Sequence, residues 1–141
     1  MAYAVKTYMD RTFPTIDVES TVHAAAQIIA EGNRGFVVVL EKGLPKGIVS
    51  SLEIVSRVVA GALDTSKVKV REVMMPLVTV DFEEDLMKAS EIMLRRNLSW
   101  LAVVKDGIIC GVVTAQGIAE RCPEYVDWAV KDIFRWSFHW K

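Results

Sequence analysis

Cysteine and histidine are scarce in this chain of 141 residues, which contains two of each. Cys110 and Cys122 lack the C-x-x-C spacing, so they predict neither a zinc site nor a disulfide framework. His23 and His139 lie far apart in the sequence, and no metal site is expected from them. So few cysteines are typical of a reducing compartment, which indicates a cytoplasmic location.

Excess charge and long apolar runs are also missing. The net charge of −1 argues against general affinity for nucleic acid or acidic membranes. No run reaches the roughly 18 apolar residues of a membrane span, and the N-terminus lacks the apolar region of a signal peptide. No spacing suggests a nucleophile and its base, which disfavours an enzyme. Apolar residues, by contrast, make up 52% of the chain, which predicts self-association.

An internal repeat dominates the sequence. A shift of 64 residues places residues 15–57 on residues 79–121 without a gap. About 3 identities would arise by chance in such a window. A module of this size cannot bury its apolar face alone, so two copies are expected to pack together, with a ligand site at their seam. Twelve pairs are identical: Thr15/Thr79, Asp17/Asp81, Glu19/Glu83, Ala25/Ala89, Ile28/Ile92, Asn33/Asn97, Val39/Val103, Gly43/Gly107, Gly47/Gly111, Val49/Val113, Ile54/Ile118 and Arg57/Arg121.

Each copy predicts the element order strand, helix, strand, strand, helix. Apolar residues at i, i+3, i+4 and i+7 indicate the first helix, for which Ser20 is a plausible N-cap in the first copy. Lys42-Gly43 and Asp106-Gly107 lie between apolar runs and predict hairpins. The fold class is therefore α+β. The predicted domains are repeat 1 at residues 1–66, repeat 2 at 67–123 and an aromatic-rich C-terminal helix at 124–141.

Residues 124–141 lie outside the repeat and contain three of the four tryptophans. Pro123 fits a helix start, and Val126, Ala129, Val130 and Ile133 form one helical face. We expect this helix to cover the chain's own core or a dimer seam. Docking of another protein through the aromatic side chains is the alternative. A membrane-surface role is disfavoured because the tail lacks a basic face.

Over roughly residues 3–122 the chain resembles a tandem pair of CBS (cystathionine beta-synthase) domains, also called a Bateman module. The resemblance rests on the V-x-x-x-M lead-ins at 5–9 and 70–74, the Thr-Ile-Asp and Thr-Val-Asp strand starts, and the tails at 47–53 and 111–117. It implies two repeats packed as a pseudo-symmetric pair, usually in a disc-like dimer. It also implies regulation rather than catalysis, with AMP, ADP, ATP or S-adenosylmethionine bound in clefts between the repeats.

The family's nucleotide motif runs Gly, two apolar residues, Ser or Thr, two residues, Asp. A hydroxyl at a helix start suits a phosphate, and a carboxylate one turn later can accept hydrogen bonds from both ribose hydroxyls. Ser50 and Glu53 fill these positions in the first copy; in the second, Thr114 supplies the hydroxyl but Gly117 replaces the acid. We therefore expect one strong site per chain. Simpler roles are N-caps for the hydroxyls and a solvated charge for Glu53.

The resemblance also implies further contacts with the nucleotide. The strand starts Thr15, Ile16, Thr79 and Val80, together with Val37, match its adenine side, although the apolar ones suit a buried core equally well. Arg34 corresponds to a basic residue facing the phosphates, and Arg96 lies near the equivalent place, where Leu98 aligns with Arg34. The sequence thus predicts a homodimeric sensor of AMP, ADP or ATP without a catalytic cofactor or metal. The alternatives are an S-adenosylmethionine sensor and a ligand-free docking module.

Overall fold

The computed structural model describes residues 3–32 and 34–122 and divides the chain into two compact units. The first-repeat unit is residues 13–77, and the second-repeat unit combines residues 1–12 with residues 78–141. The first-repeat unit is contiguous in sequence, whereas the second-repeat unit is made of two separate segments. Residues 1–12, which precede the repeated window 15–57, belong to the unit that contains the window 79–121, and the segment before residue 78 belongs to the unit that contains the window 15–57.

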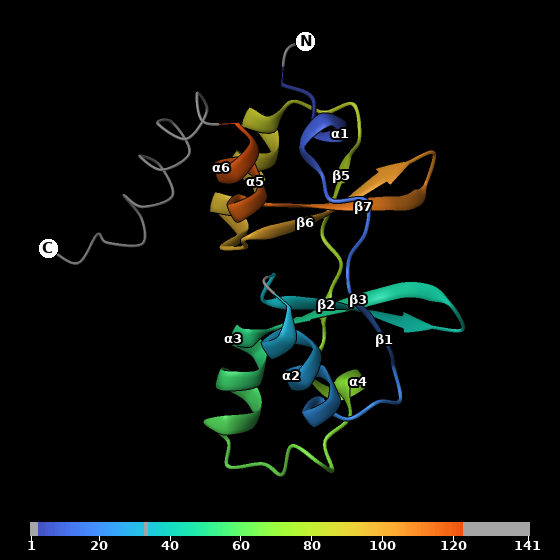
Figure 1. Ribbon diagram of the computed structural model, residues 1–141, viewed down its shortest axis with the longest axis vertical. Helices are drawn as coiled ribbons and strands as arrows, with labels where there is room; N and C mark the ends of the chain where they lie inside the picture. The colour runs from blue at the N-terminus through green and yellow to red at the C-terminus, as the bar shows by residue number, and fades with distance from the viewer. Residues whose placement is uncertain (1–2, 33, 123–141) are drawn as a thin grey trace, which may run out of the picture. The chain divides into compact units, whose positions relative to one another are not determined.

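The first-repeat unit has a four-stranded sheet whose helices lie on one face (Figure 1). The strand order is β1-β2-β3-β4, in which β1 is parallel to β2 and the other neighbours are antiparallel. The α-helix α3 continues directly into the π-helix η1. The elements are β1 (Thr15–Asp17), α2 (Val22–Glu31), β2 (Phe36–Glu41), β3 (Leu44–Ser50), α3 (Ser51–Glu53), η1 (Ile54–Val59), α4 (Val70–Val73) and β4 (Met75–Pro76).

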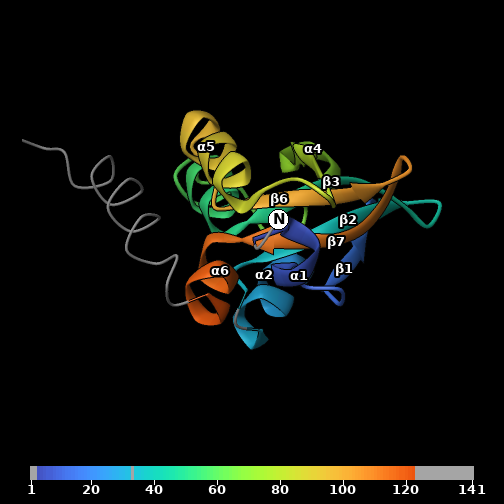
Figure 2. The ribbon, with the colours of Figure 1, turned by 90° about the horizontal axis from the view of Figure 1, so that it is seen from above.

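The second-repeat unit repeats this architecture around a three-stranded sheet of order β5-β6-β7 (Figure 2). Strand β5 is parallel to β6, and β6 is antiparallel to β7. Its elements are α1 (Val5–Tyr8), β5 (Thr79–Asp81), α5 (Leu86–Arg96), β6 (Trp100–Lys105), β7 (Ile108–Thr114) and α6 (Ala115–Arg121). The predicted α+β class and the order strand, helix, strand, strand, helix are confirmed in both units.

Both predicted hairpins are closed by two-residue turns. Lys42 and Gly43 have φ of 52° and 79°, and Asp106 and Gly107 have φ of 51° and 79°. Two consecutive residues with positive φ are the mark of a type I′ turn, whose twist matches the flanking strands. The turn therefore brings β2 against β3 and β6 against β7, which places Ser50 opposite Phe36 and Thr114 opposite Trp100.

The expectation that Ser20 caps the first helix is wrong by one residue. Helix α2 begins at Val22, and its N-cap is Thr21, whose Oγ1 accepts a hydrogen bond from the Ala24 amide at 3.1 Å. Ser20 instead belongs to the preceding turn, in which its amide donates to the Asp17 carbonyl at 3.0 Å. When two neighbouring hydroxyl residues can both cap a helix, the chain's path into the helix decides between them.

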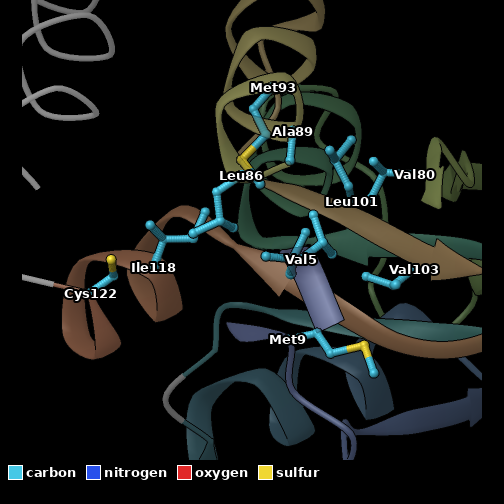
Figure 3. Close-up of a cluster of buried hydrophobic side chains, with 11 residues drawn as sticks. Val5, Met9, Val80, Leu86, Ala89, Met93, Leu101, Val103, Ile118 and Cys122 are labelled. Atoms are coloured by element: carbon cyan, nitrogen blue, oxygen red, sulfur yellow. The ribbon is translucent and has the colours of Figure 1, made fainter. Parts of the chain in front are cut away.

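Each unit has its own buried core. Each core includes residues of the segment that precedes the repeated window of the other unit. Val70 and Val73 of α4 lie in the core of the first-repeat unit. Val5 and Met9 pack with residues of α5 and β6 in the core of the second-repeat unit (Figure 3). We call residues 3–12 and 68–77 the lead-ins, and their burial shows that neither unit is complete without the lead-in that it receives.

The predicted C-terminal helix at 124–141 lies outside the described residues. In the part of the chain that is described, no helix has the length and apolar character needed to cross a membrane. Cys110 and Cys122 are both free thiols.

Candidate nucleotide-binding site

Ser50 and Glu53 are held together where β3 ends and α3 begins. The Glu53 Oε1 atom accepts hydrogen bonds from the backbone amide and from the hydroxyl of Ser50, both at 2.8 Å. Only 8% of Glu53 is exposed. The simpler interpretation of Glu53 as a solvated charge is therefore wrong, because the carboxylate is buried against the helix start.

Arg34 precedes β2 at the same end of this sheet. The Gly35 carbonyl accepts a hydrogen bond from the Ser51 amide at 3.1 Å, which joins the entry of β2 to the start of α3. Arg34, the neighbour of Gly35, is half-buried. Thr15 begins β1 and pairs with Val38, so it lies near this end of the sheet and is exposed. The structure thus brings Arg34, Ser50 and Glu53 to one end of the first-repeat unit.

The apolar candidates belong to the cores. Ile16 and Val37 lie in the buried cluster of the first-repeat unit, and Val80 lies in that of the second. Their side chains pack against other core residues, as their simpler interpretation predicts. Thr79, at the start of β5, is exposed like Thr15 and pairs with Ala102. A contact of these strand starts with adenine stays a prediction.

The second-repeat unit arranges its motif differently. The Thr114 hydroxyl is buried and accepts a hydrogen bond from the Gly117 amide at 2.8 Å, so Thr114 is an N-cap of α6. A Cβ atom on Gly117 would lie 2.9 Å from the Thr114 Oγ1 atom. The cap and a side chain at position 117 therefore compete for the same space. Arg96 is exposed in the last turn of α5.

Sequence reasoning missed a carboxylate that the lead-in brings to α6. The Asp10 Oδ2 atom lies 3.8 Å from the position that a Cβ on Gly117 would take. Asp10 is 6% exposed, forms an ion pair with Arg121 of α6, and pairs with Val112 through two backbone hydrogen bonds of 2.8 and 3.0 Å. The second-repeat unit therefore has a carboxylate at this helix start, but it comes from a residue 107 positions away from Gly117 in sequence.

The identical pair Arg57/Arg121 has a common role that the repeat could have indicated. Arg121 donates a hydrogen bond to the Tyr8 carbonyl at 3.0 Å, and Arg57 donates to the Val73 carbonyl at 3.4 Å and approaches the Met75 sulfur at 3.3 Å. Each arginine thus holds the lead-in of its unit. No such signal marked Asp10, because the equivalent residue in the other lead-in is Met75.

Within residues 3–32 and 34–122, no group of three or more His, Cys, Asp or Glu side chains could hold a metal ion.

Fold and candidate site together define a class: a tandem-repeat α+β module in which each repeat ends in a helix capped by a hydroxyl residue. The chain belongs to the CBS domain family, whose model matches residues 5–60 and 70–124. Similar solved structures include the conserved CBS domain protein TA0289 from Thermoplasma acidophilum, with 26% identity and a TM-score of 0.85. That match covers 98% of this chain and 77% of the other.

Two further relatives are similar over more than three quarters of this chain. The CBS domain protein PAE2072 from Pyrobaculum aerophilum, whose structure is a complex with AMP, has 22% identity and a TM-score of 0.78 over 89% of this chain and 98% of that one. The uncharacterized protein MK0525 from Methanopyrus kandleri is 30% identical over 77% of this chain. The match spans 56% of the length of MK0525.

Proposed function

We propose that this chain is a regulatory module that binds an adenine nucleotide, AMP, ADP or ATP, through its first-repeat unit. The observation that carries the proposal is the Ser50–Glu53 pair, a hydroxyl and a carboxylate held 2.8 Å apart at a helix start. Arg34 at the same end of the sheet supplies a cation for a phosphate. Family membership and the AMP complex of PAE2072 support this choice of ligand.

Each residue has a distinct role in the proposal. An ionised carboxylate has about four lone-pair sites, and Ser50 uses two of those on Glu53. The remaining sites accept hydrogen bonds from the ribose hydroxyls, Arg34 binds the phosphate, and Thr15 lies on the adenine side. Because Gly117 leaves the second motif without its acid, and the Asp10 carboxylate nearby is paired with Arg121, we expect one strong site per chain. Calorimetry that gave two equal strong sites would contradict this stoichiometry.

Two substitutions separate ribose recognition from phosphate recognition. Glu53→Gln keeps the shape and an acceptor for Ser50 but removes the charge, so it weakens adenosine and AMP alike by about 1.5–3 kcal/mol, or roughly 10- to 150-fold. Arg34→Ala weakens AMP and leaves adenosine nearly unchanged, because adenosine has no phosphate. Added salt reduces AMP binding more than adenosine binding through screening of that ion pair. Isothermal calorimetry measures the affinities of both variants for adenosine and for AMP.

Glu72→Gln is a matched control, since Glu72 caps α4 in the same way by accepting a hydrogen bond from the Lys69 amide at 2.8 Å. It should leave both affinities intact. If Glu53→Gln also leaves them intact while circular dichroism shows an unchanged fold, the carboxylate serves only as a cap.

The proposal includes a homodimer in the cytoplasm that regulates a partner rather than catalysing a reaction. A ligand-free docking module is the second candidate, favoured by the Gly117 departure and by the engagement of Glu53 and Asp10 within the protein. A panel of AMP, ADP, ATP and S-adenosylmethionine distinguishes the possibilities. No binding of any adenosyl compound below millimolar concentration favours the docking module. Selective binding of S-adenosylmethionine identifies that compound, and not an adenine nucleotide, as the ligand.

A further inference from the structure

Arg34 is joined to β2 by a single residue in a left-handed conformation. Gly35 has φ of 74°, which residues with a side chain rarely adopt. A Cβ on Gly35 would lie 3.8 Å from the Ser51 Oγ atom, an ordinary van der Waals distance, so a small side chain has room there. The direction of the backbone between Arg34 and β2, and not a lack of space, therefore favours glycine at this position.

Ser51 fastens Gly35 to the start of α3. The Gly35 carbonyl accepts hydrogen bonds from the Ser51 amide at 3.1 Å and from the Ser51 hydroxyl at 3.4 Å. The next residue, Phe36, is 3% exposed and pairs with Ser50 in the sheet. The backbone that follows Arg34 is thus tied to the helix start by two neighbouring residues. Gly35 and Ser51 together set the direction from which the arginine side chain leaves the sheet.

The second-repeat unit shows that the fold itself does not need this arrangement. The repeat shift of 64 places Leu98, Ser99 and Ala115 at the positions of Arg34, Gly35 and Ser51. The Ser99 carbonyl accepts a hydrogen bond from the Ala115 amide at 2.9 Å, so the backbone bond is kept. Alanine has no hydroxyl for the second bond, and Ser99 does not have a positive φ. The left-handed residue and the hydroxyl bond therefore occur in the unit that has the arginine.

We propose that Gly35 and Ser51 are positioning residues for phosphate recognition, which hold the backbone of Arg34 so that its guanidinium meets the phosphate of a nucleotide bound at Ser50 and Glu53. Both act through Arg34 and not by touching the ligand. An arginine side chain loses much rotamer freedom when it is ordered. Fixing the backbone from which it extends reduces the freedom that is left to lose, which is how preorganisation raises affinity. The inference rests on the proposed function and adds the residues that orient its cation.

The test measures AMP and adenosine affinities of the full chain by calorimetry. Ser51→Ala removes the hydroxyl bond and keeps the backbone bond, as Ala115 does in the second-repeat unit. It should weaken AMP by about 3- to 10-fold, the loss expected for one hydrogen bond, and leave adenosine unchanged. Ser56→Ala is the matched control, since its hydroxyl donates to the Leu52 carbonyl at 2.6 Å on the following helix, away from the turn. It should change neither affinity.

Gly35→Ala tests the conformation of the turn independently of Ser51. The substituted residue resists the left-handed conformation, so the turn either relaxes or is strained. AMP should bind about 5- to 30-fold more weakly, the factor that corresponds to the cost of that conformation, and adenosine should bind as before. Circular dichroism checks the fold, and Ser51→Ala alone decides the question if Gly35→Ala does not fold.

A double-substitution cycle shows whether both residues act through Arg34. In an Arg34→Ala background, Ser51→Ala and Gly35→Ala should have no further effect on AMP binding. As single substitutions, both should also make AMP binding less sensitive to added salt, because the ion pair with the phosphate is weakened.

Three results would overturn the inference and leave the nucleotide site in place. They are equal losses for adenosine and AMP, equal losses with and without Arg34, and an AMP affinity that Ser51→Ala and Gly35→Ala leave intact while Arg34→Ala lowers it. If Arg34→Ala leaves AMP binding unchanged, or if the wild-type chain binds neither compound, the proposed function itself fails and this inference fails with it.

Discussion

At Gly47 and Gly111 the two lead-ins approach the strands so closely that a side chain does not fit. A Cβ on Gly47 would lie 2.7 Å from the Met75 carbonyl oxygen, and a Cβ on Gly111 would lie 2.8 Å from the Asp10 carbonyl oxygen. Backbone oxygens cannot move aside without breaking the pairing of the lead-in. Close approach, and not a positive φ, explains why both repeats have glycine here.

We expect Gly111→Ala to destabilise the protein by about 2–3 kcal/mol, because the added methyl group forces the lead-in away from β7. Urea unfolding measures the change. Gly32→Ala is the control, since its Cβ would meet the Ile28 carbonyl at an ordinary 3.4 Å. Equal effects of the two substitutions would show that the lead-in tolerates displacement.

Ser90 is a buried polar residue whose burial is expected to lower the stability of the fold. It is 2% exposed, and its hydroxyl has no hydrogen-bond partner among the residues that the structure describes. The equivalent residue of the first repeat is Ala26. Ser90→Ala should raise the free energy of unfolding by about 1 kcal/mol, because an unmade hydrogen bond costs the desolvation of the group.

Thr114→Val is the matched control for Ser90→Ala, since the buried Thr114 hydroxyl is bonded to the Gly117 amide. It should destabilise by about 1 kcal/mol through loss of the cap. A destabilised Ser90→Ala protein would mean that the hydroxyl has a partner in the folded chain.

At the scale of elements, the lead-in helices of the two units are held by different sets of electrostatic interactions. Arg71 of α4 pairs with Glu41 at 2.7 Å and with Glu19 at 3.4 Å. In α1 the equivalent Lys6 pairs with Glu83 at 2.7 Å. Lys105 replaces Glu41 in the second repeat, and Lys6 and Lys105 lie 5.4 and 4.9 Å from the centre of the Phe82 ring. The same element is thus held by an ion-pair network in one unit and by an ion pair together with cation–π contacts in the other.

The Arg71 network predicts a loss of stability in acid. The hydrogen bond and charge of Arg71 lower the pKa of Glu41 below its ordinary value of 4.5. A lowered pKa in the folded state means that this contribution is fully present above the ordinary value and is lost as pH falls through the folded value. The stability difference between the wild type and Glu41→Gln, measured by urea unfolding, should therefore shrink as pH falls below about 4.5.

Glu31→Gln, at an exposed carboxylate outside this network, should follow the wild type across the same pH range. A Glu41→Gln difference that stays constant into acid would show that packing, and not charge, holds α4 in place.

At the scale of the whole molecule, the exchange of lead-ins makes each unit depend on a distant part of the chain. The chain passes between the two units after residue 12 and again after residue 77. Val5 and Val70 are equivalent residues of the two lead-ins, and both are fully buried. Val5 should therefore stabilise the second-repeat unit and Val70 the first-repeat unit, and neither should mainly stabilise the repeat that follows it in sequence.

This dependence can be tested with Val5→Ala and Val70→Ala, each of which should cost about 2 kcal/mol through the cavity that it leaves. Hydrogen exchange should accelerate mainly in β5 to α6 for Val5→Ala and mainly in β1 to η1 for Val70→Ala. Each variant is the control for the other. Faster hydrogen exchange in the repeat that directly follows the substituted lead-in would contradict the assignment of each lead-in to the other repeat's unit.

The sequence by itself determined the features that depend on local patterns. The 64-residue repeat, the helical spacing of apolar residues and the Lys-Gly and Asp-Gly turns predicted the α+β class and the element order, because these signals act over a few neighbouring residues. Ser50 and Glu53 were identified through the resemblance to the family's nucleotide motif, and their proximity follows locally, since three residues along a helix bring side chains together.

Only the tertiary structure decided which distant segments meet. The exchange of lead-ins, the Asp10 carboxylate beside Gly117 and the arginines that hold each lead-in all join residues far apart in sequence. Such contacts leave no periodic trace, because long-range packing selects them from many possible pairings. The tertiary structure also showed that Glu53 turns inward to Ser50 and that Thr21 rather than Ser20 begins α2, since competing hydrogen bonds are resolved only when the chain is folded.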